Sequence, residues 1–167
     1  MRENKRVLSL LVDNVSGTLS RIAGLFSRRG YNIDSLSVGE TADPRFSRMT
    51  VVCTGEELIL EQITKQLAKL VDVRHIKVLK PGESVNRELM LIKIKVMPEQ
   101  RQNITSIAQI FRAKIVDVGK ESMVIEVTGE QRKLEAFLDI LDEYEILELA
   151  RTGLAGLSRG ADDVQYL

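Results

Sequence analysis

Cysteine, histidine and tryptophan are nearly missing from this sequence: its 167 residues include one cysteine, one histidine and no tryptophan. A single cysteine excludes an internal disulfide and any metal site built from a cysteine cluster, and it favours a reducing compartment. No apolar run is long enough to span a membrane, and residues 1–6 lack the apolar stretch of a signal peptide. We therefore expect a cytoplasmic protein with no membrane association and no metal site.

An excess of charge is also absent, because 24 Lys and Arg residues balance 24 Asp and Glu residues. Nucleic-acid binding rests mainly on the neutralisation of phosphates, so a formal net charge of zero argues against it. Aromatic residues make up 4% of the chain, and the expected third strand, residues 47–53, contains none on which a base could stack. We therefore expect no nucleic-acid partner.

Hydrophobic periodicity divides the chain into two copies of one order of elements, β-α-β-β-α-β. The strands expected in the first copy are residues 7–13, 31–40, 47–53 and 71–79. The strands expected in the second copy are residues 88–96, 114–118, 123–128 and 145–151. This order predicts an α+β fold of two tandem ferredoxin-like sandwiches, each an antiparallel sheet with both helices on one face.

The first helix has a regular apolar stripe. Side chains at positions i, i+3, i+4 and i+7 predict its buried face, namely Leu19, Ile22, Ala23 and Phe26. Ser16 is the expected N-cap, and Gly30 is the expected stop.

The opposite face of the first sheet is also partly apolar. Val7 and Leu11 alternate away from the helix side of the first strand, and Val52 joins them from the third. An exposed apolar face on a small domain is commonly an association surface, so we expect a homodimer. After the last strand, three glycines predict a loose tail: Gly153, Gly156 and Gly160.

The loop from Asp13 to Thr18 is the best candidate for a ligand site. It leads into a helix, whose first N–H groups suit a carboxylate or a phosphate. Gly17 lets a ligand approach the backbone, and Asn14 offers both a donor and an acceptor. From their spacing alone, the same residues are more typical of an ordinary turn and cap. Likewise, Asn32 could offer its amide to a polar ligand or could simply be a turn residue.

No set of residues has the pattern of an active site. The only histidine, His75, lies on an expected strand without a cysteine or carboxylate cluster around it, and the serines lack a nucleophile-elbow context. Cys53 alternates with apolar residues, which is typical of a buried small side chain. We therefore expect no catalytic residue and no cofactor in this chain.

Several stretches resemble a known family. The pattern Asn14-x-x-Gly17-x-Leu19-x-Arg21, followed by residues 25–33, is similar to the opening of ACT domains, which bind free amino acids. Further stretches resemble the regulatory (small) subunits of acetolactate synthase, also called acetohydroxyacid synthase. These stretches are residues 47–50, 65–71, 87–93, 110–117, 150–153 and 157–160.

The resemblance implies an ACT domain at residues 5–80, a C-terminal ferredoxin-like domain at 86–160 and a tail at 161–167. It implies a regulatory subunit that activates the catalytic (large) subunit of branched-chain amino-acid synthesis and confers feedback inhibition by valine. Thiamine diphosphate, Mg and FAD are expected in that catalytic partner. An ACT-type amino-acid sensor for a different partner is the alternative, and a preference for valine, leucine or isoleucine stays open.

The resemblance also implies a valine site shared by two chains of an ACT dimer. The backbone N–H groups of Ser16, Gly17, Thr18 and Leu19 are expected to bind the carboxylate. Asn14, with Asn32 of the partner chain, is expected to meet the ammonium group. The isopropyl group is expected to pack near Val12 and Ile33.

Overall fold

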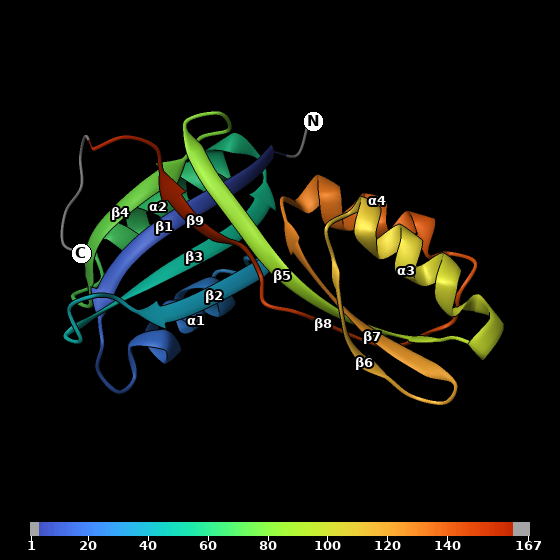
Figure 1. Cartoon of the computed structure of the whole chain (residues 1–167). Coiled ribbons are helices and arrows are strands. Elements are labelled where there is room, and N and C mark those ends of the chain that lie inside the picture. Colours follow the sequence, from blue (N-terminus) through green and yellow to red (C-terminus); the bar gives the residue numbers. More distant parts are fainter. Residues whose placement is uncertain (1–3, 162–167) are drawn as a thin grey trace. The chain divides into compact units, whose positions relative to one another are not determined.

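The computed structural model describes residues 4–161, which form two α+β units (Figure 1). The first unit contains the described residues up to Val85 together with those from Leu154 onward, and the second contains Asn86–Gly153. The predicted fold class, with β-α-β-β-α-β order in each unit, is confirmed. No helix within residues 4–161 has the length and apolar character needed to cross a membrane.

The first unit is a four-stranded antiparallel sheet in the order β2-β3-β1-β4. Its elements are β1 (Asn4–Asp13), α1 (Thr18–Arg28), β2 (Ser35–Glu40), β3 (Phe46–Gly55), α2 (Glu57–Ala68) and β4 (Val73–Leu79). Strand β2 pairs with β3 alone among the described strands, so it forms an edge. The loop between β1 and α1 lies at the end of the sheet where Asp13 pairs with Phe46.

The second unit repeats the pattern, with strand order β6-β7-β5-β8. Its elements are β5 (Ser84–Lys95), a 3-10 turn η1 (Pro98–Gln100), α3 (Arg101–Ile110), β6 (Lys114–Val118), β7 (Ser122–Gly129), α4 (Gln131–Ile140) and β8 (Ile146–Arg151). Phe111 packs edge-to-face on Phe137 in its core, with ring centroids 5.1 Å apart. Arg151 donates two hydrogen bonds to the buried carboxylate of Glu88, which ties β8 to β5.

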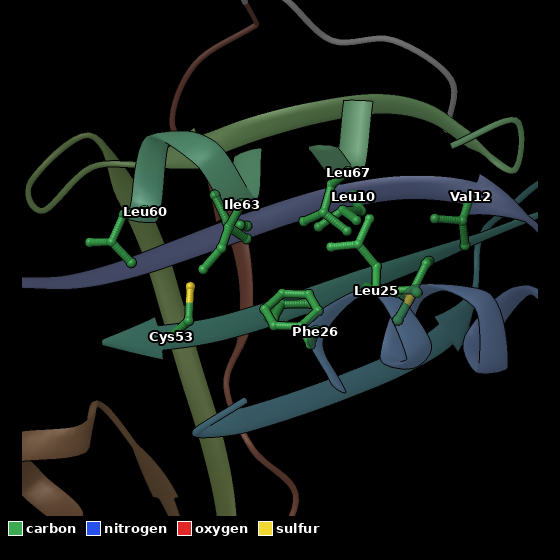
Figure 2. Close-up of a cluster of buried hydrophobic side chains, with 12 residues drawn as sticks. Leu10, Val12, Leu25, Phe26, Cys53, Leu60, Ile63 and Leu67 are labelled. Atoms are coloured by element: carbon green, nitrogen blue, oxygen red, sulfur yellow. The ribbon is translucent and has the colours of Figure 1, made fainter. Parts of the chain in front are cut away.

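The first core lies between the sheet and its two helices (Figure 2). Alternation along β1 places Leu8, Leu10 and Val12 on the helix side. In Figure 2, Phe26 of α1 and Ile63 of α2 reach into the same cluster. Cys53 is 1% exposed there, as predicted for a small apolar side chain.

The buried stripe of helix α1 includes the predicted Ile22 and Phe26 but differs from the prediction at its start. Its buried residues are Thr18, Ile22, Leu25 and Phe26, so the stripe begins at Thr18. Leu19 is 49% exposed, and the prediction that it joins the core is wrong. A step of one residue turns a helix by about 100°, which carries Leu19 off the face that Thr18 shares with Ile22.

Strand β2 begins at Ser35, four residues later than predicted. The N–H of Tyr31 donates to the carbonyl of Phe26 at 2.9 Å, so the chain stays attached to the end of α1 after Gly30. Asn32 and Ile33 therefore lie in the connection before β2 and not on the strand.

Residues 154–158, here called the strap, cross the outer face of the first sheet and contain β9 (Ala155–Ser158) (Figure 1). Side chains of three strands form hydrogen bonds with the strap. Leu154 N–H donates to Ser35 Oγ of β2 at 3.1 Å, Gly156 N–H donates to Thr50 Oγ1 of β3 at 3.2 Å, and Lys77 Nζ of β4 donates to Ser158 Oγ at 3.1 Å. The backbone of β9 pairs with β5 and not with the strands that it crosses, so the side chains of those strands satisfy the remaining backbone groups of the strap.

The strap corrects two predictions. The expected loose tail is ordered from Leu154 to Ser158, where it packs with the first unit. The apolar outer face is not free for association, because Leu11 is 0% exposed and Val52 is 2% exposed within the chain itself.

Candidate functional site

The loop between β1 and α1 is held by backbone bonds to two neighbouring turns. Asn14 N–H donates to the carbonyl of Arg45 in the β2–β3 turn at 2.8 Å. Asp13 N–H donates to the carbonyl of Asp72, just before β4, at 2.9 Å. The loop is thus fixed on both sides while its residues Asn14 to Gly17 remain exposed.

The side chain of Asn14 has its donors occupied and its acceptor available. Its Nδ2 donates to the backbone oxygen of Pro44 at 2.9 Å and to Oε2 of Glu40 at 3.2 Å. No donor to its Oδ1 occurs among residues 4–161. Asn14 therefore presents an amide oxygen, with the Glu40 carboxylate beside it, and this pair suits a cationic group such as an ammonium.

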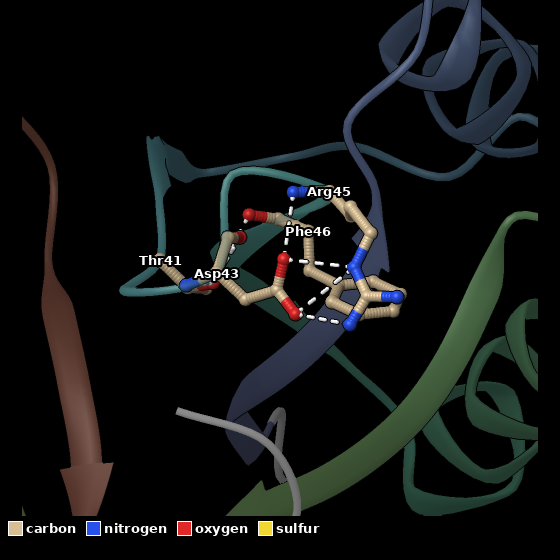
Figure 3. A network of polar contacts seen from close by, with 4 residues as sticks. All are labelled: Thr41, Asp43, Arg45 and Phe46. Carbon is tan, nitrogen blue, oxygen red and sulfur yellow. Dashed lines mark hydrogen bonds and ion pairs between the residues drawn. The ribbon is translucent and has the colours of Figure 1, made fainter.

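The turn that supports Asn14 is itself a polar network (Figure 3). Asp43 accepts from the backbone N–H of Arg45 at 3.0 Å and from its guanidinium at 2.6 Å, and Thr41 Oγ1 donates to the carbonyl of Asp43 at 2.8 Å. The hydrogen bonds from Arg45 lower the pKa of Asp43 to about 2. The turn predicted at Asp43–Pro44 is confirmed.

Gly17, and not Ser16, is the N-cap of α1. Gly17 has φ +87°, a left-handed conformation that glycine adopts without strain, and no side chain caps this end of the helix. Its carbonyl accepts the first helical bond, from Arg21 N–H at 3.0 Å. The prediction that the Ser16 side chain caps the helix is wrong.

The start of α1 offers N–H groups to an anion. Within residues 4–161, no acceptor binds the N–H of Ser16, Gly17 or Leu19. Thr18 differs, because its N–H donates to the Val15 carbonyl at 3.4 Å and its side chain is 5% exposed. The first turn contains no acidic residue to compete with an anion. Three of the four predicted N–H groups are therefore available.

The apolar residues beside this loop are not those predicted. Val12 is 1% exposed and lies in the core, so it cannot line an open site. Val15 and Leu19 are 57% and 49% exposed next to the free N–H groups. These two side chains are the available apolar surface at the helix start.

Asn32 and Ile33 lie far from Asn14 in the same chain. They precede β2, whereas Glu40, the last residue of β2, is the one that Asn14 contacts. Six strand residues at about 3.3 Å each separate the two ends. Asn32 Nδ2 donates to Asp34 Oδ1 at 2.9 Å, and Ile33 packs on the core. One chain alone does not bring the predicted site residues together.

Two charged residues form an ion pair behind the loop, and of these Arg21 was named from the sequence, in the ACT-like pattern, but Asp72 was not. Arg21 of α1 forms an ion pair with Asp72, which is 8% exposed. Hydrogen bonding within the pair raises the pKa of Arg21 and lowers the pKa of Asp72. The two residues are 51 positions apart, so the local pattern that contains Arg21 gives no sign of its contact with Asp72.

The structure also bears on the residues considered for catalysis. His75 lies half-buried on β4. Across residues 4–161, no cluster of three or more His, Cys, Asp or Glu side chains could hold a metal ion.

Comparison with known proteins identifies both units. Residues 8–75 match the family described as "AHAS small subunit-like ACT domain". The first unit is therefore an ACT domain, and the molecule is of the ACT-domain regulatory class. Residues 87–160 match the family described as "Small subunit of acetolactate synthase". The chain belongs to the family of acetolactate synthase small subunits.

Individual relatives are similar to this chain over nearly its whole length. The chain is 49% identical to the acetolactate synthase isozyme 3 small subunit of Escherichia coli K12, covering 93% of this chain and 96% of the relative. It is 44% identical to a probable acetolactate synthase small subunit of Methanothermobacter thermautotrophicus, covering 96% of both. The crystal structure of the acetolactate synthase small subunit of Thermotoga maritima superposes with a TM-score of 0.86 at 39% identity, covering 95% of this chain and 99% of that one.

Family membership and the ACT domain together support a regulatory role for this chain. A small subunit of acetolactate synthase implies a catalytic subunit as its partner.

Proposed function

We propose that this chain activates the catalytic subunit of acetolactate synthase and makes it sensitive to feedback inhibition by valine, in branched-chain amino-acid synthesis. The reaction belongs to the partner, to which we assign thiamine diphosphate, Mg and FAD. The observation that carries the proposal is the loop at the start of α1, where free N–H groups and a free amide oxygen lie side by side.

The loop has the groups that a free amino acid requires. The N–H groups of Ser16, Gly17 and Leu19, at the positive end of α1, would bind the carboxylate. The Asn14 oxygen, next to the Glu40 carboxylate, would accept from the ammonium group. The exposed side chain of Leu19 would contact the isopropyl group.

The remaining predicted residues would come from a second copy of the chain. Strand β2 is an edge with unpaired backbone groups, so it can pair with the same strand of a partner. Antiparallel pairing about a two-fold axis sets the start of one β2 against the end of the other. The partner subunit's Asn32 and Ile33 would then approach Asn14 and Glu40, which completes the site across a homodimer.

A shared site explains how an effector could regulate an enzyme that it does not touch. Valine bound between two chains would stabilise one dimer geometry, and a catalytic subunit that contacts the dimer would respond to it. A coupling free energy of about 1–3 kcal/mol is enough for useful inhibition. Leucine and isoleucine each add one methylene, worth about 1–3 kcal/mol, so we expect incomplete discrimination against them.

The test is inhibition of the reconstituted two-subunit enzyme by valine, with wild-type chain and with Asn14→Ala. We expect the wild-type enzyme to be activated by this chain and inhibited by valine. Asn14→Ala should abolish the inhibition while enzyme activity without valine persists, because the variant lacks the acceptor for the ammonium group. Glu57→Gln, at the opposite end of the sheet, is the control and should be inhibited as wild type. Equal inhibition of Asn14→Ala would contradict the placement of the site.

A further inference from the structure

We propose that the Arg21–Asp72 ion pair is the positioning device of the effector loop. In this view the pair sets the backbone conformation in which Ser16 and Gly17 present their N–H groups to the carboxylate of an amino acid. The inference rests on the proposed function, since it concerns the same loop.

The contacts of Arg21 join the loop to the opposite side of the sheet end. Its Nε and Nη2 donate to the two carboxylate oxygens of Asp72, the latter at 3.1 Å, and Nη2 also lies 3.5 Å from the Ser16 carbonyl oxygen. The backbone carbonyl of Asp72 accepts from the backbone N–H of Asp13 at 2.9 Å. The bidentate pair thus contacts Ser16 inside the loop, and the backbone of Asp72 holds Asp13 at the start of the loop.

The guanidinium of Arg21 also lies against Gly17. A β-carbon on Gly17 would be 2.7 Å from Arg21 Nη1 and 3.4 Å from its Cζ. The φ of +87° favours glycine here, and a β-carbon would in addition displace the Arg21 guanidinium from its present position. This close approach restricts the backbone of the loop on the side that faces Arg21. The N–H groups of Ser16 and Gly17 remain free.

Asp72 is the residue that keeps Arg21 in this place. Its side chain is 11% exposed, whereas that of Arg21 is 50% exposed. Without the carboxylate, a half-exposed guanidinium has no fixed partner and leaves Gly17. The loop then samples other conformations, and the effector must select the binding-competent one, which weakens its apparent affinity.

The decisive variants are Asp72→Asn and Arg21→Lys, tested in the full chain by calorimetric titration with valine. We expect Asp72→Asn to weaken valine binding at least tenfold, and Arg21→Lys to weaken it less because an ammonium can still reach one carboxylate oxygen. The control is Glu57→Gln, which breaks the Arg6–Glu57 pair at the other end of the same sheet and should leave the affinity unchanged. Wild-type affinity in Asp72→Asn would overturn the proposal.

Amide hydrogen exchange separates local positioning from general destabilisation. Residues 15–19 should exchange faster in Asp72→Asn than in wild type, while the core strand segment 49–53 should keep its protection. Equal protection of residues 15–19 in both proteins, or a uniform loss in both segments, would overturn the proposal. If the wild-type chain binds no branched-chain amino acid, the proposed function fails, and hydrogen exchange still decides whether the pair positions the loop.

Discussion

At the scale of single residues, the use of each hydrogen-bonding atom distinguishes a ligand group from a structural one. The side-chain amide of Asn14 donates to two acceptors within the chain, and its oxygen stays available to a ligand. The backbone N–H of Thr18, in contrast, donates to the Val15 carbonyl. Asn14 and Thr18 therefore differ in the groups that they offer to a ligand, although both are polar residues near the start of α1.

Gly17 gives a stability prediction at this scale. Gly17→Ala should destabilise the protein by about 1–2 kcal/mol, because alanine resists a φ of +87° and its β-carbon meets Arg21. Gly24→Ala is the matched control, since Gly24 lies within α1 with no atom within 4 Å of the added carbon. It should stabilise the protein by about 0.5–1 kcal/mol through helix propensity. Urea unfolding measures both, and equal effects of the two substitutions would refute the argument.

Asp43 gives a prediction about pH. Its pKa is about 2 in the folded chain because Arg45 stabilises the carboxylate, and its ordinary value is 3.8. The contribution of the pair is therefore complete above about pH 4 and is lost as the pH falls towards 2. Titration of the Asp43 carboxyl by NMR should give a midpoint near 2, and Arg45→Gln should return it towards 3.8. An unshifted midpoint in the wild type would disprove the pairing.

At the scale of elements, the outer face of the first sheet carries hydroxyl groups that bind the backbone of the strap. The hydroxyl of Thr50 is on a buried central strand, where an apolar side chain would be usual, and it accepts the Gly156 N–H. On β2, Ser35 Oγ accepts from the Leu154 N–H, and Ser37 Oγ donates to the Leu154 carbonyl. These hydroxyls satisfy backbone groups that would otherwise be buried without partners.

Thr50→Val tests this account. Valine keeps the shape of threonine but leaves the Gly156 N–H unsatisfied, so we expect a loss of about 1–3 kcal/mol in the free energy of unfolding. Thr54→Val, at an exposed position on the same strand, should cost less. Chemical denaturation of the two variants provides the comparison, and a neutral Thr50→Val would show that the hydroxyl does not hold the strap.

At the scale of the whole molecule, the proposed effector site requires a second chain paired at the edge strand β2. Val38 is 49% exposed on this edge, so Val38→Asp would place a charge from each chain at the proposed two-fold contact. We expect this variant to be monomeric in light scattering and to lose valine binding together with dimerisation. Leu58→Asp, at a 68% exposed position of α2, should remain dimeric. A wild-type monomer at micromolar concentration would exclude the shared site.

The order and type of the elements followed from periodicity, because alternation along β1 and the helical spacing in α3 and α4 are local properties. The buried stripe of α1 contains Ile22 and Phe26 as predicted, but it also contains Thr18 and Leu25, and Leu19 is exposed. The strap was predicted as a loose tail because its partners, such as Thr50 and Lys77, are about 80–105 positions away, and no local pattern records them.

The sequence by itself determined the two-unit α+β fold, the buried Cys53, the turn at Asp43 and the loop whose backbone is available to a ligand. These features depend on neighbours within a few residues. Tertiary structure alone decided that the strap covers the outer face, that Arg21 meets Asp72 behind Gly17, and that Asn14 and Asn32 occupy opposite ends of β2. Such contacts join residues whose proximity arises only when the sheet assembles, because long-range pairing depends on the whole strand order.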